Sequence, residues 1–150
     1  MKKILIFGLP GSGKSYLAEP LAAELGGVWI NADQVRGHYD DWDFSDEGRM
    51  RQAMRMKFLS DGVVRAGKYA ITDFVCPFQN ARSDFQPDYS VWMDTIEEGR
   101  YEDTNKIFEK PATVDMLRGD DVLHAVDHII HTWRQDVHVT LAAIIRAKYE

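Results

Sequence analysis

The segment GLPGSGKS, residues 8–15, constrains the fold of this chain more than any other feature. It matches the pattern G-x-x-x-x-G-K-[ST], follows the apolar run at residues 4–7 and precedes a helical pattern that starts near Tyr16. In such a loop the glycines let successive backbone N–H groups turn onto phosphate oxygens, and the lysine adds a positive charge. The segment therefore predicts a strand, a phosphate-binding loop and a helix, rather than an ordinary glycine-rich turn.

Each part of this loop has a role in binding a nucleoside triphosphate. Lys14 suits the bridge between the β- and γ-phosphates, and the Ser15 hydroxyl suits Mg²⁺. We therefore expect ATP and Mg²⁺ as cofactors and phosphate transfer as the reaction. The residues expected to bind the nucleotide are Gly8, Leu9, Pro10, Gly11, Ser12, Gly13, Lys14 and Ser15.

Strand and helix patterns alternate along the first two thirds of the chain. Such alternation is typical of a parallel sheet with helices on both faces. We therefore predict an α/β fold of the P-loop nucleotide kinase type, with three layers and a mostly parallel sheet, in a single domain over residues 1–150. The expected strands are 3–7, 28–30, 68–73 and 89–94, and the expected helices are 14–25, 46–66 and a short one after a turn at Pro77.

The remaining segments carry weaker patterns. Residues 97–111 are polar and poorly periodic, and they predict a short lid over the substrates. A short strand is expected near 112–116, and after Gly119 an i, i+3/i+4 spacing of apolar residues predicts one long helix or two nearly collinear helices. In the helix at 46–66, the same spacing predicts a buried face made of Met50, Met54, Phe58, Leu59 and Val63.

Three histidines, His124, His128 and His131, would share one face of that C-terminal helix. This spacing can bind a metal, but no carboxylate or cysteine cluster accompanies it. A solvated polar face or a subunit contact is the favoured interpretation. The terminal helix could therefore serve as a homodimer contact.

Composition narrows the classes of partner. The net charge is −6 and no basic run is visible, so nucleic acid is not an expected partner. No apolar stretch approaches the roughly 20 residues of a transmembrane helix. Cys76 is the single cysteine and a strand is expected from residue 3, so we expect neither an internal disulfide nor a signal peptide, and a cytoplasmic location.

A carboxylate and an arginine follow the second predicted strand. Asp33 lies at the carboxyl end of that strand, where open α/β sheets bind ligands, and it is our candidate for orienting or deprotonating an acceptor hydroxyl and for helping to hold Mg²⁺. A role as helix N-cap is compatible with this one. Arg36, one helical turn further on, suits an anionic acceptor, with a solvated surface arginine as the alternative.

Four motifs in order resemble the adenylylsulfate (APS) kinase family. GLPGSGKS is followed by NADQVR where that family has D-G-D-x-x-R, and by DFSDEGR where it has G-F-S-x-x-D-R. TDFVCPFQNAR then stands where the family has A-F-I-S-P-x-x-x-x-R. Taken singly, only the first motif is specific. Together the four motifs cover roughly residues 1–95.

The resemblance implies roles for individual residues. Asp33 would be the acceptor-side acid, Arg36 and Arg49 would bind the sulfate–phosphate part of APS, and Phe44 would stack on its adenine. Phe44 as an ordinary core aromatic is the alternative. The other residues expected to contact the acceptor are Gln52, Phe74, Val75 and Cys76, with Lys106 and Phe108 from the shortened lid.

The chain departs from the family pattern at several positions. Asn31 replaces the first Asp of D-G-D, Gln52 stands where the family has Asn, and Met54 replaces one of two paired arginines. Cys76 stands where the family usually has Ser, so no serine-dependent role carries over. The lid is reduced to GRYEDTNKIFEKP, in which Phe108 would supply a second face for the adenine.

Three functions are compatible with these residues. The leading one is a kinase that transfers the γ-phosphate of MgATP to the 3′-hydroxyl of adenosine 5′-phosphosulfate (APS), giving PAPS and ADP. The second is a P-loop kinase for a nucleoside or polynucleotide hydroxyl, because NADQVR also resembles the N-x-D-x-x-R of 5′-hydroxyl polynucleotide kinases. The third is a non-catalytic nucleotide-binding module.

Overall fold

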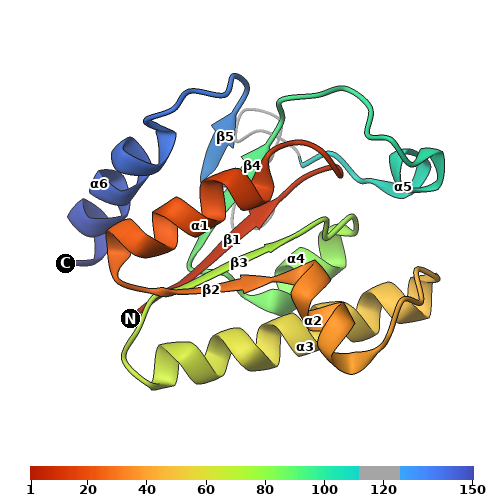
Figure 1. The fold of residues 1–150 in the computed structure, drawn as a ribbon, viewed down its shortest axis with the longest axis horizontal. Helices are drawn as coiled ribbons and strands as arrows, with labels where there is room; N and C mark the ends of the chain where they lie inside the picture. Colours follow the sequence, from red (N-terminus) through yellow and green to blue (C-terminus); the bar gives the residue numbers. More distant parts are fainter. Residues whose placement is uncertain (112–125) are drawn as a thin grey trace, which may run out of the picture.

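The computed structural model describes residues 1–111 and 126–150, which form a five-stranded sheet with helices on both faces (Figure 1). The strand order is β2-β3-β1-β4-β5, and all four pairings are parallel. The phosphate-loop strand is therefore central, as the predicted α/β fold requires. The strands are β1 (Lys3–Phe7), β2 (Val28–Asn31), β3 (Ala70–Phe74), β4 (Tyr89–Met93) and β5 (His128–Ile130).

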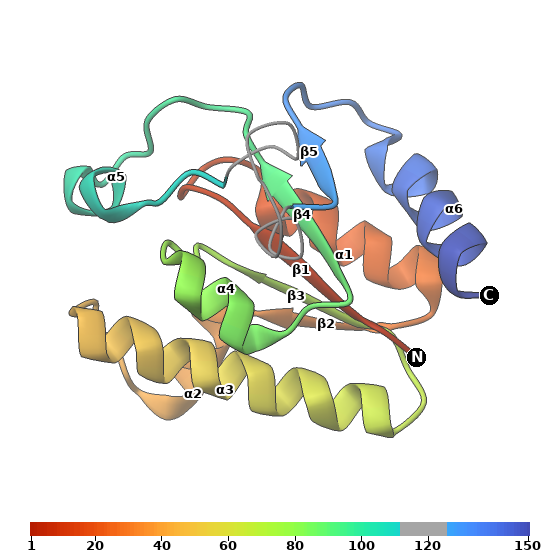
Figure 2. The same cartoon turned by 180° about the vertical axis from the view of Figure 1, so that it is seen from behind.

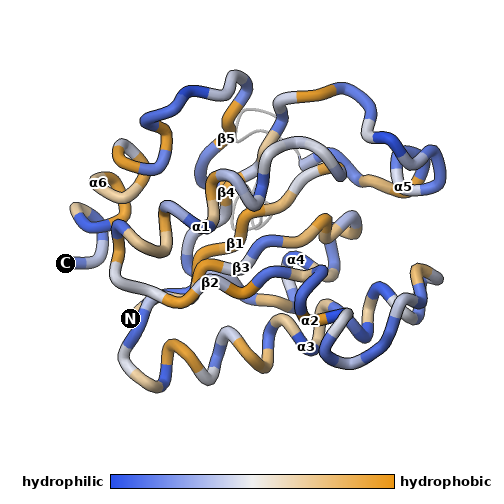
Figure 3. Tube along the Cα trace, viewed as in Figure 1, coloured by the Kyte–Doolittle hydropathy of each residue, from blue (hydrophilic) through white to orange (hydrophobic). Residues whose placement is uncertain are grey.

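The helices form the two outer layers. The views from the two sides show α1 and α6 over one face of the sheet and α3 and α4 over the other (Figures 1 and 2). Hydrophobic residues concentrate along the central strands between these layers (Figure 3). The helices are α1 (Lys14–Leu25), α2 (Ala32–Tyr39), α3 (Asp46–Arg65), α4 (Gln79–Phe85), α5 (Glu102–Ile107) and α6 (Val137–Tyr149).

The alternation of side chains along β1 divides the core into two clusters. Ile4 and Ile6 face α1 and α6, where they pack with residues such as Leu21. Leu5 and Phe7 belong to the cluster on the other face, with residues from α3 and α4. All five residues of β1 are buried, because successive side chains of a central strand enter both layers.

Local signals in the sequence fix the ends of the helices that carry the site. Helix α1 starts after Gly13 and ends at Gly26, both in the left-handed conformation that glycine adopts without strain. The side chain of Asn31 caps α2 by accepting a hydrogen bond from the Gln34 backbone N–H at 3.0 Å. The N-cap is therefore Asn31, and Asp33 lies exposed in the first turn of α2.

The predicted buried face of α3 is wrong for two of its members. Met54 and Phe58 are 71% and 77% exposed. The inward positions instead include Gln52, which bonds to the Ala32 carbonyl at 3.0 Å, and Ser60, whose hydroxyl contacts a threonine hydroxyl on β3 at 2.6 Å. Polar side chains with hydrogen-bond partners thus occupy the face that an apolar spacing pattern assigns to the core.

The prediction of continuous helix after residue 119 is also wrong. Residues 128–130 form the edge strand β5, which pairs with β4, and helix begins only at Val137. His128 therefore lies on a strand, and His131 follows it and pairs with Asp94 at 3.2 Å, so these two do not share a helical face. His124 and the predicted strand near 112–116 lie outside the described residues.

The described residues contain neither a helix that could cross a membrane nor a cluster of metal ligands. None of their helices combines the length and the apolar character needed to cross a membrane. Within the same residues, no group of three or more His, Cys, Asp or Glu side chains is placed to hold a metal ion.

Candidate functional site

The phosphate loop connects β1 to α1 and is tightly packed. A Cβ atom on Gly8 would lie 2.8 Å from the Met93 carbonyl oxygen, so only glycine fits where the loop leaves the strand. Gly11 and Gly13 have φ angles of 85° and 98°. The Thr95 hydroxyl donates to the backbone carbonyl of Ser12 at 2.7 Å and anchors the loop from the β4 side. The loop is therefore preformed as a phosphate cradle.

Two side chains in the loop fit a polyphosphate. Lys14 donates to the Leu9 carbonyl at 3.0 Å. Burial lowers its pKa to about 8, and the negative charges of Asp73 and Asp33 oppose that shift. The hydroxyl of Ser12 is buried and has no hydrogen-bond partner among the described residues. Both groups would gain from an anionic oxygen, because it favours the ammonium form and accepts from the hydroxyl.

Asp73 is a site residue that the sequence analysis missed. It is the second-last residue of β3, it pairs in register with Asn31, and it is 2% exposed. Its carboxylate accepts hydrogen bonds from the Trp29 indole at 2.5 Å, from the Asn31 amide at 3.3 Å and from the Ser15 hydroxyl at 3.4 Å. Burial raises the pKa of Asp73, while the hydrogen bonds and the charge of Lys14 lower it.

A sequence signal for Asp73 exists. An aspartate stands two residues after the short apolar run Tyr69–Ile71, at the end of a predicted strand, and the carboxyl ends of parallel strands meet at one edge of the sheet. Two oxygen donors, the Ser15 hydroxyl and the Asp73 carboxylate, suit Mg²⁺, which prefers hard oxygen ligands.

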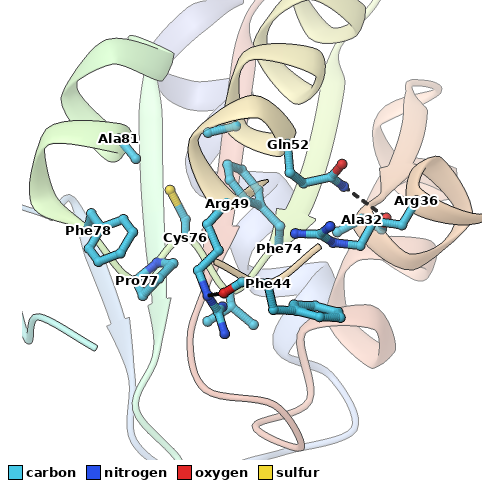
Figure 4. Close-up of a pocket in the computed structure, with 12 residues that line it drawn as sticks. Ala32, Arg36, Phe44, Arg49, Gln52, Phe74, Cys76, Pro77, Phe78 and Ala81 are labelled. Atoms are coloured by element: carbon cyan, nitrogen blue, oxygen red, sulfur yellow. Dashed lines mark hydrogen bonds between the residues drawn. The ribbon is translucent and has the colours of Figure 1, made fainter. Parts of the chain in front are cut away.

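Residues that the sequence predicts to contact the acceptor meet at a pocket beside this edge (Figure 4). The Arg36 guanidinium lies 4.3 Å from the centre of the Phe44 ring, and that of Arg49 lies 5.4 Å from it. Arg49 also donates to the Phe44 carbonyl at 2.9 Å. The pocket is lined by Ala32, Arg36, Phe44, Arg49, Gln52, Ala53, Phe74, Val75, Cys76, Pro77, Phe78 and Ala81.

Seven of the predicted acceptor residues thus lie around one pocket. Arg36 is 4% exposed, and it also donates to the carbonyls of Asp41 and Asp43 at 2.9 and 3.1 Å. It therefore holds the loop that carries Phe44, which is 51% exposed and is not an ordinary core aromatic. The seven are Arg36, Phe44, Arg49, Gln52, Phe74, Val75 and Cys76.

The two other basic side chains near the start of α3 are already paired. Arg51 donates to Asp41 at 2.7 Å, and Arg55 also donates to Asp41. These two arginines hold the pKa of Asp41 well below its usual range. Arg51 and Arg55 thus form ion pairs with the acidic loop between α2 and α3. Arg36 and Arg49, in contrast, line the pocket.

The predicted lid contains helix α5, which projects beyond the sheet on the same side as the start of α3 (Figures 1 and 2). Its Thr104 is 4% exposed and accepts a hydrogen bond from Arg49 at 3.2 Å. Lys106 is exposed and pairs with Glu102 on the same helix at 3.6 Å. The short lid is therefore fastened to a pocket residue through Thr104, and Lys106 is not among the residues that line the pocket.

Phe108 packs against the core. Its ring lies 6.5 Å from that of Phe7 and 4.9 Å from the Arg82 guanidinium. Arg82 also lies 4.3 Å from the Phe7 ring, and it donates to the carbonyls of Cys76 and Pro77 at 2.8 and 3.2 Å. In this arrangement Phe108 anchors the end of the lid beneath the Cys76–Pro77 turn and does not line the pocket.

Known proteins resemble this chain in sequence and in structure. A family model described as adenylylsulphate kinase matches residues 2–97. An adenylyl-sulfate kinase of Bacillus licheniformis is 36% identical over 85 residues, which are 53% of this chain and 43% of that protein. A probable adenylyl-sulfate kinase of Bacillus subtilis is 36% identical over 81 residues, 50% of this chain and 41% of that protein. The matched part thus spans less than half of these relatives.

Solved structures share the fold of this chain. APS kinase CysC of Mycobacterium tuberculosis, in complex with AMPPNP and APS, has a TM-score of 0.74 at 16% identity, over 97% of each chain. Shikimate kinase from Acinetobacter baumannii has a TM-score of 0.62 at 17% identity, over 99% of this chain and 95% of that one. The fold is that of the P-loop kinases. Because the family model covers more than half of its residues, the chain belongs to the adenylylsulphate kinase family.

Proposed function

We propose that this protein transfers the γ-phosphate of MgATP to the 3′-hydroxyl of APS, giving PAPS and ADP. The observation that supports the proposal is the sequence of residues at the start of α2: Asn31 bonds to Ser15 of the phosphate loop, Ala32 lines the pocket, and Asp33 follows directly. Its charge acts on Lys14 of the phosphate loop and on Arg36 of the pocket. A carboxylate so placed can orient an acceptor hydroxyl toward a phosphate held in the loop.

The donor half has the groups that phosphoryl transfer requires. The loop amides and Lys14 would hold the phosphates, and Ser15 and Asp73 are the oxygen donors that would hold Mg²⁺. Mg²⁺ bound there supplies positive charge that offsets the negative charge of the phosphates. The buried position of Lys14 strengthens its electrostatic effect, since water screens it less than at the surface.

The acceptor half suits a nucleotide that carries an extended anion. Arg36 and Arg49 are positively charged and flank an aromatic ring, so a base could stack on Phe44 while its anionic group meets the guanidinium groups. Gln52, held by the Ala32 carbonyl, would fix the wall of the pocket next to Asp33.

The test is phosphate transfer with APS as the acceptor. ADP formation should depend on APS, and mass spectrometry should find the added phosphate on the 3′-oxygen of the ribose. A parallel reaction with oligonucleotide 5′-hydroxyl ends addresses the other acceptor class. If APS leaves ADP formation at background while the oligonucleotide is phosphorylated, the acceptor assignment is wrong.

A further inference from the structure

Trp29 connects the hydrophobic core to the buried carboxylate of Asp73. It stands in β2, the edge strand next to β3, and its half-buried ring packs against the core cluster that faces α1. Because side chains alternate along a strand, Trp29 and Asn31 point to the same face of the sheet. Asp73 is the register partner of Asn31 on β3. The tryptophan is therefore held by the core while its indole N–H meets Asp73.

The two carboxylate oxygens of Asp73 have different partners. Oδ2 accepts the indole N–H of Trp29 at 2.5 Å, which is shorter than the bonds from Asn31 and Ser15. Oδ1 lies 3.4 Å from the hydroxyl oxygen of Ser15. The Asn31 amide lies 3.3 Å from both oxygens and does not distinguish them. Trp29 thus fixes which oxygen of Asp73 faces the phosphate loop.

The Oδ1 atom of Asp73 is placed to act as one ligand of a small octahedral cation. Adjacent oxygen ligands of Mg²⁺, each at about 2.0–2.1 Å from the ion, are separated by about 3 Å. Oδ1 and the Ser15 hydroxyl oxygen are 3.4 Å apart, so one Mg²⁺ would contact both after a small adjustment. Because the indole occupies Oδ2, Asp73 offers a single oxygen to the metal.

We propose that Trp29 is a positioning residue that makes Asp73 a monodentate ligand and thereby favours Mg²⁺ over Ca²⁺ beside the phosphate loop. Ca²⁺ binds in flexible geometry and accepts a bidentate carboxylate, whereas Mg²⁺ requires near-ideal octahedral geometry. Side chains that orient a metal ligand commonly change metal affinity by about 10- to 100-fold. This role rests on the proposed function only in that the loop binds a metal–nucleotide complex, and it is independent of the acceptor.

The test compares two cations on a variant that lacks the indole N–H. Trp29→Phe keeps an aromatic ring against the core and removes the donor to Asp73. Binding of ADP is measured by calorimetry with Mg²⁺, with Ca²⁺ and with EDTA alone. We expect Trp29→Phe to raise the Kd of MgADP about tenfold and that of CaADP less than about threefold, with binding in EDTA unchanged. A purely structural role of Trp29 would weaken both metal complexes to the same extent.

Trp92→Phe is the matched control, because it removes an indole from β4 in the core cluster on the other face of the sheet. It should leave the ratio of the two Kd values unchanged. Equal weakening of MgADP and CaADP by Trp29→Phe, or no weakening of either, would overturn the positioning role while nucleotide binding stands. A wild-type chain whose binding of ADP does not respond to Mg²⁺ would overturn the proposed metal site as well.

A second measurement uses the wild-type chain and needs no variant. The indole N–H resonance of Trp29 in the NMR spectrum reports the bond to Asp73, and it is assigned through its contacts with the side-chain amide of Asn31. It should shift when Mg²⁺ is added to the ADP complex, whereas the indole resonance of Trp92 should stay in place. An unchanged Trp29 resonance on binding of Mg²⁺ would contradict the proposed role.

Discussion

The side-chain amide of Asn31 donates to both carboxylate oxygens of Asp73 at 3.3 Å. The two residues are register partners at the ends of β2 and β3, and Asn31 also donates to the Ser15 hydroxyl at 3.2 Å. In the motifs that this chain resembles, an aspartate stands at the position of Asn31 and an alanine at that of Asp73. In this chain the carboxylate beside Ser15 is therefore carried by β3 and not by the last residue of β2.

The position of this carboxylate predicts that moving it from residue 73 to residue 31 preserves metal binding, whereas removing it does not. Asp73→Asn should weaken the Mn²⁺-dependent binding of ADP about tenfold, because it removes the charged oxygen donor beside Ser15. The double variant Asn31→Asp/Asp73→Asn returns a carboxylate to the same place and should recover most of that affinity. Paramagnetic resonance of Mn²⁺ in titrations with ADP measures both. A single variant that binds Mn²⁺ and ADP like the wild type would contradict a metal-side role for Asp73.

Removing Arg82 should destabilise the protein strongly. Arg82→Ala leaves the carbonyls of Cys76 and Pro77 without their donor and removes the cation between two phenylalanine rings. We expect the free energy of unfolding to fall by about 3 kcal/mol, from the usual cost of lost charged hydrogen bonds. Urea unfolding measures this, and Arg65→Ala, at an exposed position on α3, is the control. Equal stability of the two variants would show that the Arg82 contacts contribute little.

The hydrogen bond between Arg49 and Thr104 should matter for the acceptor. Thr104→Val keeps the shape of a buried side chain but removes the oxygen that accepts from Arg49. The KM for APS should rise about fivefold, from the loss of a bond worth about 1 kcal/mol, with little change in kcat or in the KM for ATP. Glu102→Gln breaks only the exposed pair with Lys106 and should change none of these. An unchanged KM for APS in Thr104→Val would show that this hydrogen bond does not contribute to acceptor binding.

Cys76 should be unreactive in the folded protein. Burial raises the pKa of its thiol to about 12, so at pH 8 almost all of it is protonated and the nucleophilic thiolate is scarce. Alkylation by iodoacetamide, followed by mass spectrometry, should be slow at pH 8 and rapid once guanidinium unfolds the chain. Because the pKa is raised, the rate should keep increasing well above pH 9. Rapid alkylation of the folded protein at pH 8 would show that the thiol is accessible.

Local signals in the sequence predict much of the fold. The apolar runs of β1 and β4, the GLPGSGKS loop and the caps at Ser45 and Gly26 act within a few residues, so their elements were predicted with small errors in bounds. The edge strand β5 was missed because three apolar-biased residues fit a helical spacing as well as a strand. What makes them a strand is pairing with β4, which the local sequence does not encode.

The candidate site likewise combines residues that local sequence predicts with residues whose role depends on contacts between distant segments. Seven of the twelve residues that line the pocket were predicted, because they belong to motifs with recognisable spacing. Asp73 was missed because its importance depends on the register that sets β3 beside both β1 and β2. Met54 and Phe58 were assigned to the core because periodicity cannot show that Gln52 and Ser60 have buried partners on neighbouring elements.

Substitution of Asp33 most directly tests the central claim, which is that this protein is a kinase. The measurement is APS-dependent ADP formation by wild type and Asp33→Asn, together with the affinity of each for MgATP. Asp33 is exposed in the first turn of α2, outside the contacts that form the phosphate loop, so the variant should still bind MgATP. We predict a fall in turnover of about 10²-fold or more with MgATP affinity retained, as for loss of a residue that accepts the proton of the attacking hydroxyl. Unchanged turnover in Asp33→Asn, or no APS-dependent turnover in the wild type, would contradict the account.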